Sequence, residues 1–483
     1  MQTRVAVIGA GPGGYVAAFR AADLGMAVTL VDEAPKPGGV CLYRGCMPSK
    51  ALLHAARVVS EAREAERWGI AFGEPAIDPV RLRAWKDEVV AKLTGGLALL
   101  ARQRGVTCVQ GRAAFADAAT LSVGPAGASA TGEASRVAFD HAIIATGSRP
   151  ARPGPLALDD PRVLDSTGAL DIDRIPKSLL VVGGGYIGLE LGTVYAALGA
   201  DVTIVEMTGS LLPGADADLV RVLARRMNRI AAAVHVNTTV RGLTPRPDGI
   251  EAVLSGSAAG GGASAGGGPR EWTERFDAVL VAVGRTPNSG IEGLDRTRVE
   301  RDERGFIRVD AQRRTAEPAI FAVGDATGEP MLAHKAFAEA GVAVETIAGR
   351  NAAFAPRAIP AVVFTDPEVA WCGLTEMQAA REGRDVRVAR FPWGASGRAL
   401  TLDRPEGVTK LVIDPGTERV LGVGIAGVGA GELIAEGVLA VEQELRASEL
   451  GQMIHAHPTL SETMGEAAEA FLGQSAHIYR PKR

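Results

Sequence analysis

Val5-Ala-Val-Ile-Gly-Ala-Gly-Pro-Gly-Gly14 runs from a short apolar segment straight into a glycine-rich turn. The apolar residues predict a buried strand, and the sequence after the turn predicts a helix that continues to Leu24. Val28-Thr-Leu-Val31 then predicts a second strand, so this part of the chain forms a βαβ unit. In such a unit, closely spaced glycines let the backbone N–H groups at a helix N-terminus approach a pyrophosphate.

The glycines of this G-x-G-x-x-G pattern are Gly9, Gly11 and Gly14, and Asp32 ends the following strand. A carboxylate at that position can accept hydrogen bonds from a ribose. Glycines also serve ordinary tight turns, so the pattern alone is weak. The strand before it, the helix after it and the acid together favour a dinucleotide-binding site.

The chain repeats this design further on. A second apolar run leads into Gly183, Gly185 and Gly188, and Glu206 ends the next predicted strand. Two dinucleotide cofactors are therefore predicted. Glu206 should accept a hydrogen bond from an adenosine 2′-hydroxyl and repel a 2′-phosphate, and residues 207–212 include no Arg or Lys. This second site is predicted to favour NAD over NADP.

Composition and charge argue against several classes of protein. The chain is 47% hydrophobic and 22% charged with a formal charge of −4, which gives no general attraction to nucleic acid or anionic membranes. No apolar run approaches the roughly 20 residues that cross a bilayer, and no secretory leader precedes the first strand. The four cysteines fit a reducing compartment. We expect a cytoplasmic protein that binds neither nucleic acid nor membranes.

Two of the cysteines form the pattern Cys41-Leu-Tyr-Arg-Gly-Cys46. Two cysteines at this spacing are commonly buried thiols or, less often, metal ligands. No further Cys or His pair lies nearby to complete a zinc site, so no metal is expected. In a regular helix, five residues rise about 7.5 Å, which exceeds the Cα separation of a disulfide. We therefore expect Cys41 in a loop or a distorted turn.

A resemblance to a known family rests on Gly38-Gly-Val-Cys-Leu-Tyr-Arg-Gly-Cys-Met-Pro-Ser-Lys50. This string is similar to the redox-disulfide signature of the pyridine nucleotide-disulfide oxidoreductases. The resemblance implies that Cys46 contacts a flavin as the charge-transfer thiolate and that Cys41 exchanges with the substrate. It also implies that Lys50 lies near flavin N5 and pairs with Glu190.

The string departs from the commonest form of the signature at two positions. Tyr43 stands where Asn is commoner, and Met47 stands where Ile or Val is commoner. Neither side chain is expected to touch the redox atoms, so tuning of the potential or of access is expected.

Shorter strings elsewhere in the chain extend the resemblance. The resemblance implies that the first of the two dinucleotides is FAD. Asp325 is similar to the aspartate that hydrogen-bonds a ribityl hydroxyl, and Tyr186 is expected either to cover the isoalloxazine or simply to pack. The helix start at 331–335 is expected to face the pyrimidine edge of the flavin, where negative charge develops. The resemblance thus adds Thr146, Gly147, Met331, Leu332, Ala333 and His334 to the FAD site, and Ile187, Glu190 and Gly284 to the NAD site.

The last motif is Ile454-His-Ala-His-Pro-Thr-Leu-Ser-Glu462. A single histidine is more often a structural hydrogen-bonding residue than a base, but this string resembles the C-terminal signature of the lipoamide-specific members of the family. The resemblance implies that His457 takes the proton of a dithiol while Glu462 orients the ring. A free thiol has a pKa near 8.5, so a positioned base increases the thiolate that attacks a disulfide. His455 is interpreted as structural.

The resemblance implies oxidation of free or protein-bound dihydrolipoamide, with NAD reduced through FAD and a Cys41–Cys46 disulfide. It implies a homodimer in which Cys46 of one subunit faces His457 of the other. The expected partners are the acyltransferase core of a 2-oxo acid dehydrogenase complex and its lipoyl domains. Two alternatives remain: an NADH-dependent reductase of another disulfide, and a docking subunit of such a complex.

The predicted fold class is α/β, with two Rossmann-like dinucleotide-binding domains and a C-terminal α+β dimerisation domain. The predicted parts are a FAD-binding domain with the redox disulfide, an NAD-binding domain, a central segment that completes the FAD site, and an interface domain. Their bounds are 1–149, 150–284, 285–354 and 355–483. The low-complexity stretch from Ser255 to Pro269 is interpreted as the loop of an elongated hairpin.

Overall fold

The computed structural model describes residues 1–126, 134–256 and 270–479, and its first elements are the expected βαβ unit. Strand β1 (Gln2–Ile8) leads through Gly11 into α1 (Pro12–Asp23), and β2 (Val28–Asp32) follows. β1 pairs in parallel with β2 on one side and with β6 (Ser135–Ile144) on the other. The ends of β1 and β6 therefore meet at the first glycine-rich turn.

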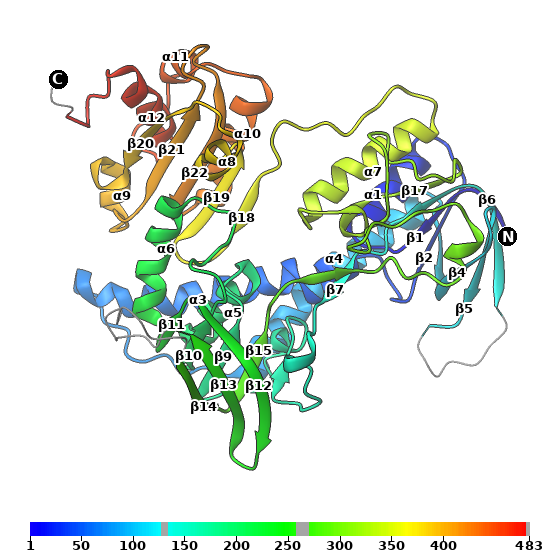
Figure 1. Ribbon diagram of the computed structural model, residues 1–483, viewed down its shortest axis with the longest axis horizontal. Helices are drawn as coiled ribbons and strands as arrows, with labels where there is room; N and C mark the ends of the chain where they lie inside the picture. Colours follow the sequence, from blue (N-terminus) through cyan, green and yellow to red (C-terminus); the bar gives the residue numbers. More distant parts are fainter. Residues whose placement is uncertain (127–133, 257–269, 480–483) are drawn as a thin grey trace.

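The first sheet has the strand order β3-β2-β1-β6-β5-β4, and β17 (Ile320–Ala322) pairs with β6. The remaining strands are β3 (Thr107–Gln110), β4 (Arg112–Asp117) and β5 (Thr120–Gly124). Helix α7 (Ala333–Ile347) follows β17 and packs against α1 (Figure 1). A segment nearly 300 residues after α1 thus completes the first dinucleotide unit.

The second unit has the same design. It consists of β9 (Ser178–Val182), α5 (Tyr186–Ala197) and β10 (Asp201–Val205). These strands lie in a parallel sheet of order β11-β10-β9-β15-β8, which also contains β8 (Val163–Leu164), β11 (Ala233–His235) and β15 (Ala278–Val281). The predicted repeat of the dinucleotide fold is confirmed.

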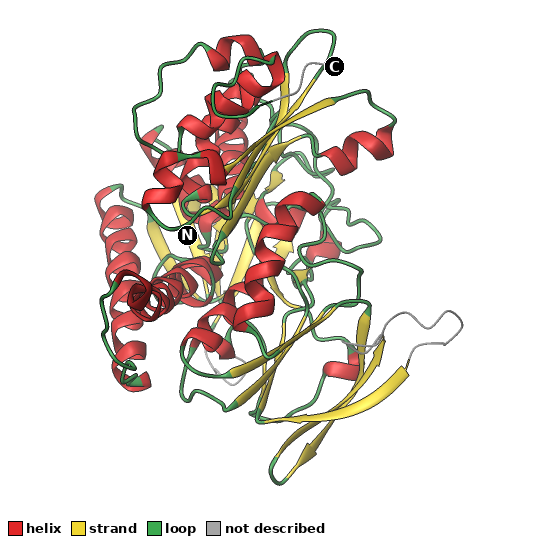
Figure 2. Cartoon of the chain, turned by 90° about the vertical axis from the view of Figure 1, so that its left-hand side faces the viewer, coloured by secondary structure: helices red, strands yellow, loops and turns green. Residues whose placement is uncertain are grey.

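An antiparallel sheet of three strands is inserted between β11 and β15. Its strands are β12 (Thr238–Arg246), β13 (Gly249–Gly256) and β14 (Arg270–Phe276). They project from the helix-covered body of the molecule (Figure 2). The antiparallel pairing of β13 with β14 confirms the predicted hairpin, while most of its predicted loop lies outside the described residues.

Three helices lie between the two dinucleotide units. Helix α2 (Gly39–Arg44) is followed by α3 (Cys46–Glu64), which contacts α5 of the second unit. The third is α4 (Pro79–Gln103), whose first turn is capped by the Asp78 carboxylate accepting from two backbone N–H groups. Proline at the first helical position needs no hydrogen-bond partner for its nitrogen, which explains why α4 begins there.

The C-terminal region is an antiparallel sheet of order β18-β19-β22-β21-β20. Its core includes Trp393, which is fully buried and donates from Nε1 to Thr409 Oγ1. Two helices, α10 and α12, pack on the sheet, so an α+β unit is present. The elements are β18 (Ala361–Val363), β19 (Glu368–Gly373), β20 (Arg387–Pro392), β21 (Val408–Ile413), β22 (Val420–Gly427), α10 (Ala430–Glu442) and α12 (Glu462–Leu472).

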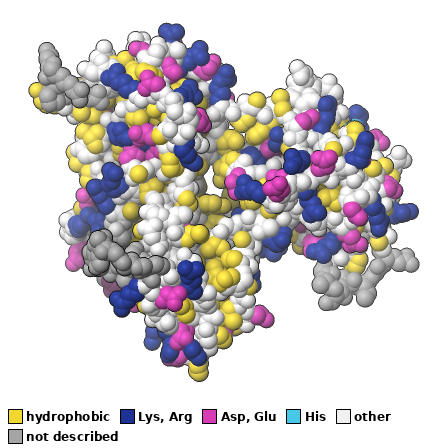
Figure 3. Space-filling view, viewed as in Figure 1, with side chains coloured by type: hydrophobic (Ala, Val, Ile, Leu, Met, Phe, Trp, Pro, Cys, Tyr) yellow, Lys and Arg dark blue, Asp and Glu magenta, His cyan; other side chains and the backbone are white. Residues whose placement is uncertain are grey.

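The molecule is hollowed between the part that carries β1 and α7 and the part that carries the C-terminal sheet. Figure 3 shows hydrophobic side chains gathered in this hollow. Across residues 1–126, 134–256 and 270–479, no helix has both the length and the apolar character needed to cross a membrane. The predicted domain bounds of 149, 284 and 354 remain a prediction.

Candidate active site

The first glycine-rich turn has no room for side chains on its inner side. A Cβ at Gly9 would lie 2.4 Å from the carbonyl oxygen of Ala145, and a Cβ at Gly14 would lie 1.7 Å from that of Gly9. At Gly11, by contrast, the nearest atom would be Gly39 Cα at 3.8 Å. The middle glycine therefore borders open space, where a pyrophosphate can approach the backbone.

The second turn repeats this pattern. A Cβ at Gly183 would lie 2.4 Å from the oxygen of Ala282, and a Cβ at Gly188 would lie 2.1 Å from that of Gly183. At Gly185 a Cβ would meet no described atom within 4 Å. Both turns thus fit a dinucleotide phosphate, as their sequences predict.

In each of the two units, the acid at the end of the second strand holds the glycine-rich turn in place. Asp32 Oδ2 accepts from the N–H of Ala10 at 2.6 Å, and Glu206 Oε2 accepts from the N–H of Gly184 at 2.7 Å. A carboxylate oxygen can accept more than one hydrogen bond, so each acid can also receive a ribose hydroxyl. The predicted ribose contacts of Asp32 and Glu206 remain predictions.

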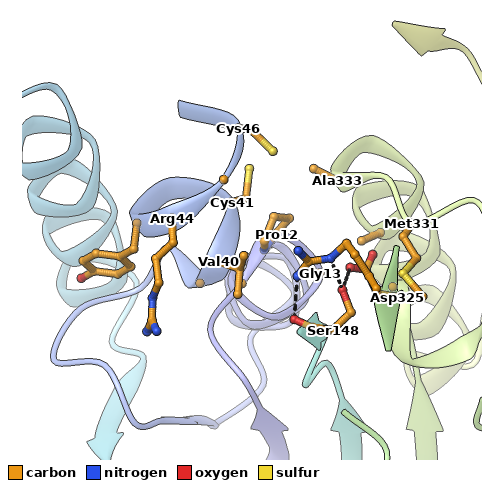
Figure 4. A pocket seen from close by; sticks show the side chains of 18 of the residues that line it. Pro12, Gly13, Val40, Cys41, Arg44, Cys46, Ser148, Asp325, Met331 and Ala333 are labelled. Carbon is orange, nitrogen blue, oxygen red and sulfur yellow. Dashed lines mark hydrogen bonds between the residues drawn. The ribbon is translucent and has the colours of Figure 1, made fainter. Parts of the chain in front are cut away.

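One continuous cavity joins the first turn to the two cysteines and to Asp325 (Figure 4). Gly14, Leu332 and His334 do not line it, although the sequence predicts them in the FAD site. The predicted residues that line its wall are Gly9, Gly11, Asp32, Cys41, Cys46, Lys50, Thr146, Gly147, Tyr186, Ile187, Glu190, Asp325, Met331 and Ala333. An elongated cofactor that begins at the turn would therefore end beside the cysteines.

The cysteines lie on two consecutive helices. Cys41 is in the middle of α2 and Cys46 is the first residue of α3, so the prediction that Cys41 lies in a loop or distorted turn is wrong. The backbone deviates instead at Gly45, where φ is −148° and ψ is −112°. This break between the 6-residue helix α2 and the 19-residue helix α3 brings the thiols together (Figure 4), which a single continuous helix could not do.

The two thiols differ in acidity. A hydrogen bond from Cys41 and the positive charge of Lys50 outweigh burial and lower the pKa of Cys46 to about 7. The same hydrogen bond, together with burial, raises the pKa of Cys41. Cys46 also opens the 19-residue helix α3, whose N-terminus favours negative charge. The arrangement therefore supports a thiolate on Cys46 and a protonated Cys41 when the pair is reduced.

Lys50 and Glu190 form an ion pair beside the cysteines. Lys50 Nζ donates to Glu190 Oε2 at 2.8 Å and to Oε1 at 3.1 Å. A residue that sequence reasoning missed completes the group: the N–H of Phe364 donates to Glu190 Oε1 at 3.0 Å. Nothing local in the sequence around Phe364 indicates this contact.

Asp325 lies in the short 3-10 helix η5 (Gly324–Thr327) and is held by two further residues that the predicted site lacks. Ser148 Oγ donates to Asp325 Oδ2 at 2.5 Å, and Arg285 Nε donates to Ser148 Oγ at 2.7 Å (Figure 4). Ser148 and Arg285 meet because β7 (Ser148–Pro150) pairs with β16 (Arg285–Pro287). Asp325 thus lies where a polyhydroxyl chain in the cavity could reach it.

The N-terminus of α7 borders the same cavity. Its first residue, Ala333, lines the wall together with Met331, and Leu332 is the N-cap residue. His334 turns away, with Nε2 2.7 Å from the carbonyl oxygen of Pro360. The helix N-terminus can therefore stabilise negative charge in the cavity, whereas the His334 side chain bonds elsewhere.

His457 and Glu462 form a separate pair in the C-terminal region. Nδ1 of His457 lies 2.8 Å from Glu462 Oε1, and Glu462 Oε2 accepts from the N–H of Thr459 at 2.7 Å. Burial opposes ionisation, but these two contacts hold the pKa of Glu462 below its ordinary value. As expected, His455 pairs elsewhere, with Glu436 at 2.8 Å.

The His457 side chain is 79% exposed, and no described residue after Ala336 lines the cavity. Within one chain, therefore, the structure brings together the cysteines, Lys50 and Glu190, but not the histidine pair. The histidine is free to approach a site on another molecule.

Comparisons with known proteins agree with this site. Residues 3–340 match the family model described as pyridine nucleotide-disulphide oxidoreductase, and residues 359–468 match the dimerisation domain of that family, which supports a homodimer. The chain is 47% identical to the dihydrolipoyl dehydrogenase of Haemophilus influenzae over 100% of its own length and 98% of the relative's. It is 44% identical to that of Geobacillus stearothermophilus over 99% and 98%.

Among solved structures, LpdA from Mycobacterium tuberculosis is similar over 97% of this chain and 99% of that one, with a TM-score of 0.86 and 26% identity. The HOCl-induced flavoprotein disulfide reductase RclA from Escherichia coli is similar over 96% of this chain and 99% of that one, with a TM-score of 0.83 and 26% identity. These matches imply FAD and NAD(H) as cofactors, which the two glycine-rich turns fit. The chain belongs to the pyridine nucleotide-disulphide oxidoreductase family.

Proposed function

We propose that this chain is a dihydrolipoyl dehydrogenase, which oxidises free or protein-bound dihydrolipoamide to lipoamide and reduces NAD to NADH. The observation that carries the proposal is the adjacent pair of Cys41 and Cys46 at the end of a cavity that begins at a dinucleotide turn. Relatives with that name, 47% and 44% identical over nearly the whole chain, support the choice of substrate.

The reaction begins with the oxidised pair. A substrate thiolate attacks Sγ of Cys41, the Cys41–Cys46 bond breaks, and Cys46 leaves as a thiolate. The second substrate sulfur then attacks the mixed disulfide, which releases lipoamide and leaves Cys41 as a thiol. One of the two substrate protons stays on Cys41, and the other goes to the histidine base.

When bound, FAD supplies a two-electron carrier between the cysteines and NAD. NAD⁺ accepts two electrons and one proton, and the remaining proton is released to solvent, so the disulfide is restored. Lys50 and Glu190 hold charge beside Cys46, whose low pKa favours the thiolate while the pair is reduced. Asp325, Thr146, Gly147 and the α7 N-terminus would hold FAD, and Glu206 would select NAD.

The base is proposed to come from the partner of a homodimer. His457 is exposed and absent from the wall of its own subunit's cavity, so His457 of the partner subunit would complete the site. Glu462 would orient that imidazole and stabilise its charged form. A monomer would then be inactive, which is the expected consequence of a shared site.

The partners follow from the same proposal. Protein-bound dihydrolipoamide would be presented by the lipoyl domains of a 2-oxo acid dehydrogenase complex, and the enzyme would attach to the acyltransferase core. A cytoplasmic location, expected from the few cysteines, is part of the proposal.

The decisive experiment measures NADH formation from dihydrolipoamide and NAD by the purified, FAD-loaded protein. Rapid turnover that is lost in Cys46→Ser and is much slower with NADP is the expected result. A yellow dimer without turnover would overturn the substrate assignment and favour the alternative of an NADH-dependent reductase of another disulfide. Turnover by the isolated protein would in turn exclude a docking role alone.

A further inference from the structure

Phe364 comes from the C-terminal sheet yet contacts the ion pair beside the cysteines. It follows β18 directly, and its N–H donates to Glu190 Oε1 at 3.0 Å. Its ring faces Lys50, with Nζ 4.5 Å from the ring centroid. The same residue therefore touches the anion through its backbone and the cation through its ring.

The two contacts restrict the ion pair in complementary ways. Glu190 is 4% exposed, so the N–H of Phe364 satisfies an oxygen that water does not reach freely. Lys50 is 31% exposed and could otherwise turn its ammonium toward solvent. An aromatic face attracts the ammonium and makes that movement less favourable.

The segment that carries Phe364 is itself anchored. Asp366 pairs with Arg404 of its own domain and with Arg226 of α6 (Ala217–Ile230), the latter at 3.3 Å. Arg226 also pairs with Glu64, the last residue of α3, at 2.6 Å. The segment that carries Phe364 is thus tied, through Asp366 and Arg226, to the far end of the helix that begins with Cys46.

We propose that Phe364 is a positioning residue, which keeps the Lys50 ammonium close to Cys46 and so links the C-terminal domain to the redox pair. The inference rests on the proposed function, in which Cys46 is the thiolate that faces the cofactor. Phe364 acts through Lys50 and Glu190 and takes no direct part in the reaction. The charged and titratable groups that interact with Cys46 among the described residues are Cys41 from α2, Lys50 from α3, Glu190 and Tyr186 from α5, and Tyr15 from α1.

The test measures how the acidity of Cys46 depends on the ring. In a Cys41→Ser background, where the hydroxyl keeps a hydrogen-bond donor, the protein is treated with iodoacetamide across a pH series. Trypsin then releases Gly45–Lys50, or Gly45–Arg57 where Lys50 is replaced, and either peptide contains Cys46 as its single cysteine for quantitation by mass spectrometry. The variants are Phe364→Leu, which removes the ring, Phe364→Tyr, which keeps it, and Lys50→Met, which removes the charge.

Phe364→Leu should move the alkylation midpoint to higher pH and slow the reaction at pH 7 roughly threefold, because a displaced ammonium stabilises the thiolate less. Phe364→Tyr should match its parent, and Lys50→Met should shift the midpoint at least as far as Phe364→Leu. A Phe364→Leu profile that coincides with its parent, while that of Lys50→Met is shifted, would overturn the proposal. If Phe364→Leu does not fold, as judged by circular dichroism and FAD content, Phe364→Met provides the same comparison.

Failure of the proposed function would look different. A Cys-intact protein that forms no NADH from dihydrolipoamide, but whose Cys46 profile still responds to the ring, would leave the positioning inference standing. An enzyme that forms NADH, but whose Cys46 profile is the same with and without the Phe364 ring, would overturn the positioning inference and leave the proposed function standing.

Discussion

Nδ1 of His457 lies 2.8 Å from Oε1 of Glu462, at the start of α12, and neither residue lines the cavity of its own chain. A carboxylate in that position selects the tautomer that leaves Nε2 as the proton acceptor, and it stabilises the imidazolium that forms. Glu462→Gln should therefore lower kcat for dihydrolipoamide oxidation at least tenfold and shift the acid limb of the pH–rate profile.

The matched control for that variant is Glu436→Gln, because Glu436 holds His455 at the same distance of 2.8 Å. This control should retain nearly full activity. Equal losses in the two variants would mean that Glu462 has only a structural role.

Glu206 supports a prediction on cofactor choice. Its two oxygens accept from the N–H groups of Gly184 and Thr208, so its removal would loosen the turn as well as remove charge. Glu206→Gln keeps an oxygen for the turn but no longer repels a 2′-phosphate. The ratio of kcat/KM for NADP to that for NAD should rise about tenfold, whereas Glu206→Ala should lower kcat/KM for both. An unchanged ratio in Glu206→Gln would contradict charge selection by Glu206.

Much of this molecule could be predicted because its main signals are local. The strand, glycine turn and helix at Gly9 and again at Gly183 follow from spacing and apolar periodicity, and the structure contains both. The expectation of a loop at Cys41 is wrong because regular helix geometry from residue 41 to residue 46 is not the only alternative to a loop. A break at Gly45 lets two helical segments meet instead.

The missed residues come together only through the topology of the fold. Ser148 meets Asp325 across 177 positions and Arg285 across 137, and Phe364 meets Glu190 across 174. No periodicity or local motif relates residues at such separations. Their contacts depend on which strands become neighbours, and a single sequence read by pattern does not determine that.

Glu339 supports a prediction on cofactor retention. It is fully buried, pairs with Arg313 at 2.8 Å and Lys335 at 3.0 Å, and accepts from the N–H of Gly324 at 2.6 Å, next to Asp325. Glu339→Ala would leave the buried Lys335 and the partly buried Arg313 without their anion, at a cost of about 3–5 kcal/mol in the free energy of unfolding. We expect faster FAD release, measured by the rise of flavin fluorescence on dilution.

Glu345→Ala is the control for this variant, because Glu345 lies on the same helix but pairs with the half-exposed Arg20. It should release FAD at the parent rate. If Glu339→Ala also keeps the parent rate, the contacts of Glu339 do not support the segment around Asp325 that is proposed to hold FAD.

Lys410 of β21 supports the last prediction. It is 1% exposed and lies 2.7, 2.8 and 2.6 Å from the carboxylates of Asp216, Asp218 and Glu376. Asp216 and Asp218 are at the start of α6, so the cluster joins the second dinucleotide unit to the C-terminal sheet. The three acids surround an ammonium, and Lys410→Met would leave them to repel one another. Urea unfolding should show a loss of about 3–5 kcal/mol, whereas the exposed Lys92→Met should show almost none.

The same cluster makes the stability of the fold depend on pH. Burial acts to raise the pKa of Asp218, but hydrogen bonds from Lys410 and Arg390 outweigh it and hold that pKa below its ordinary value. Its contribution to stability is thus complete above about pH 3.9 and is lost as the pH falls through the lowered folded value. The pKa of Lys410 is raised by its three acids despite burial, so its contribution is complete below about pH 10.4 and is lost as the pH rises through the raised folded value. The difference in free energy of unfolding between Lys410→Met and its parent should therefore be largest between these two pH values and become smaller on either side. A difference that is constant with pH would show that the cluster is held by packing alone.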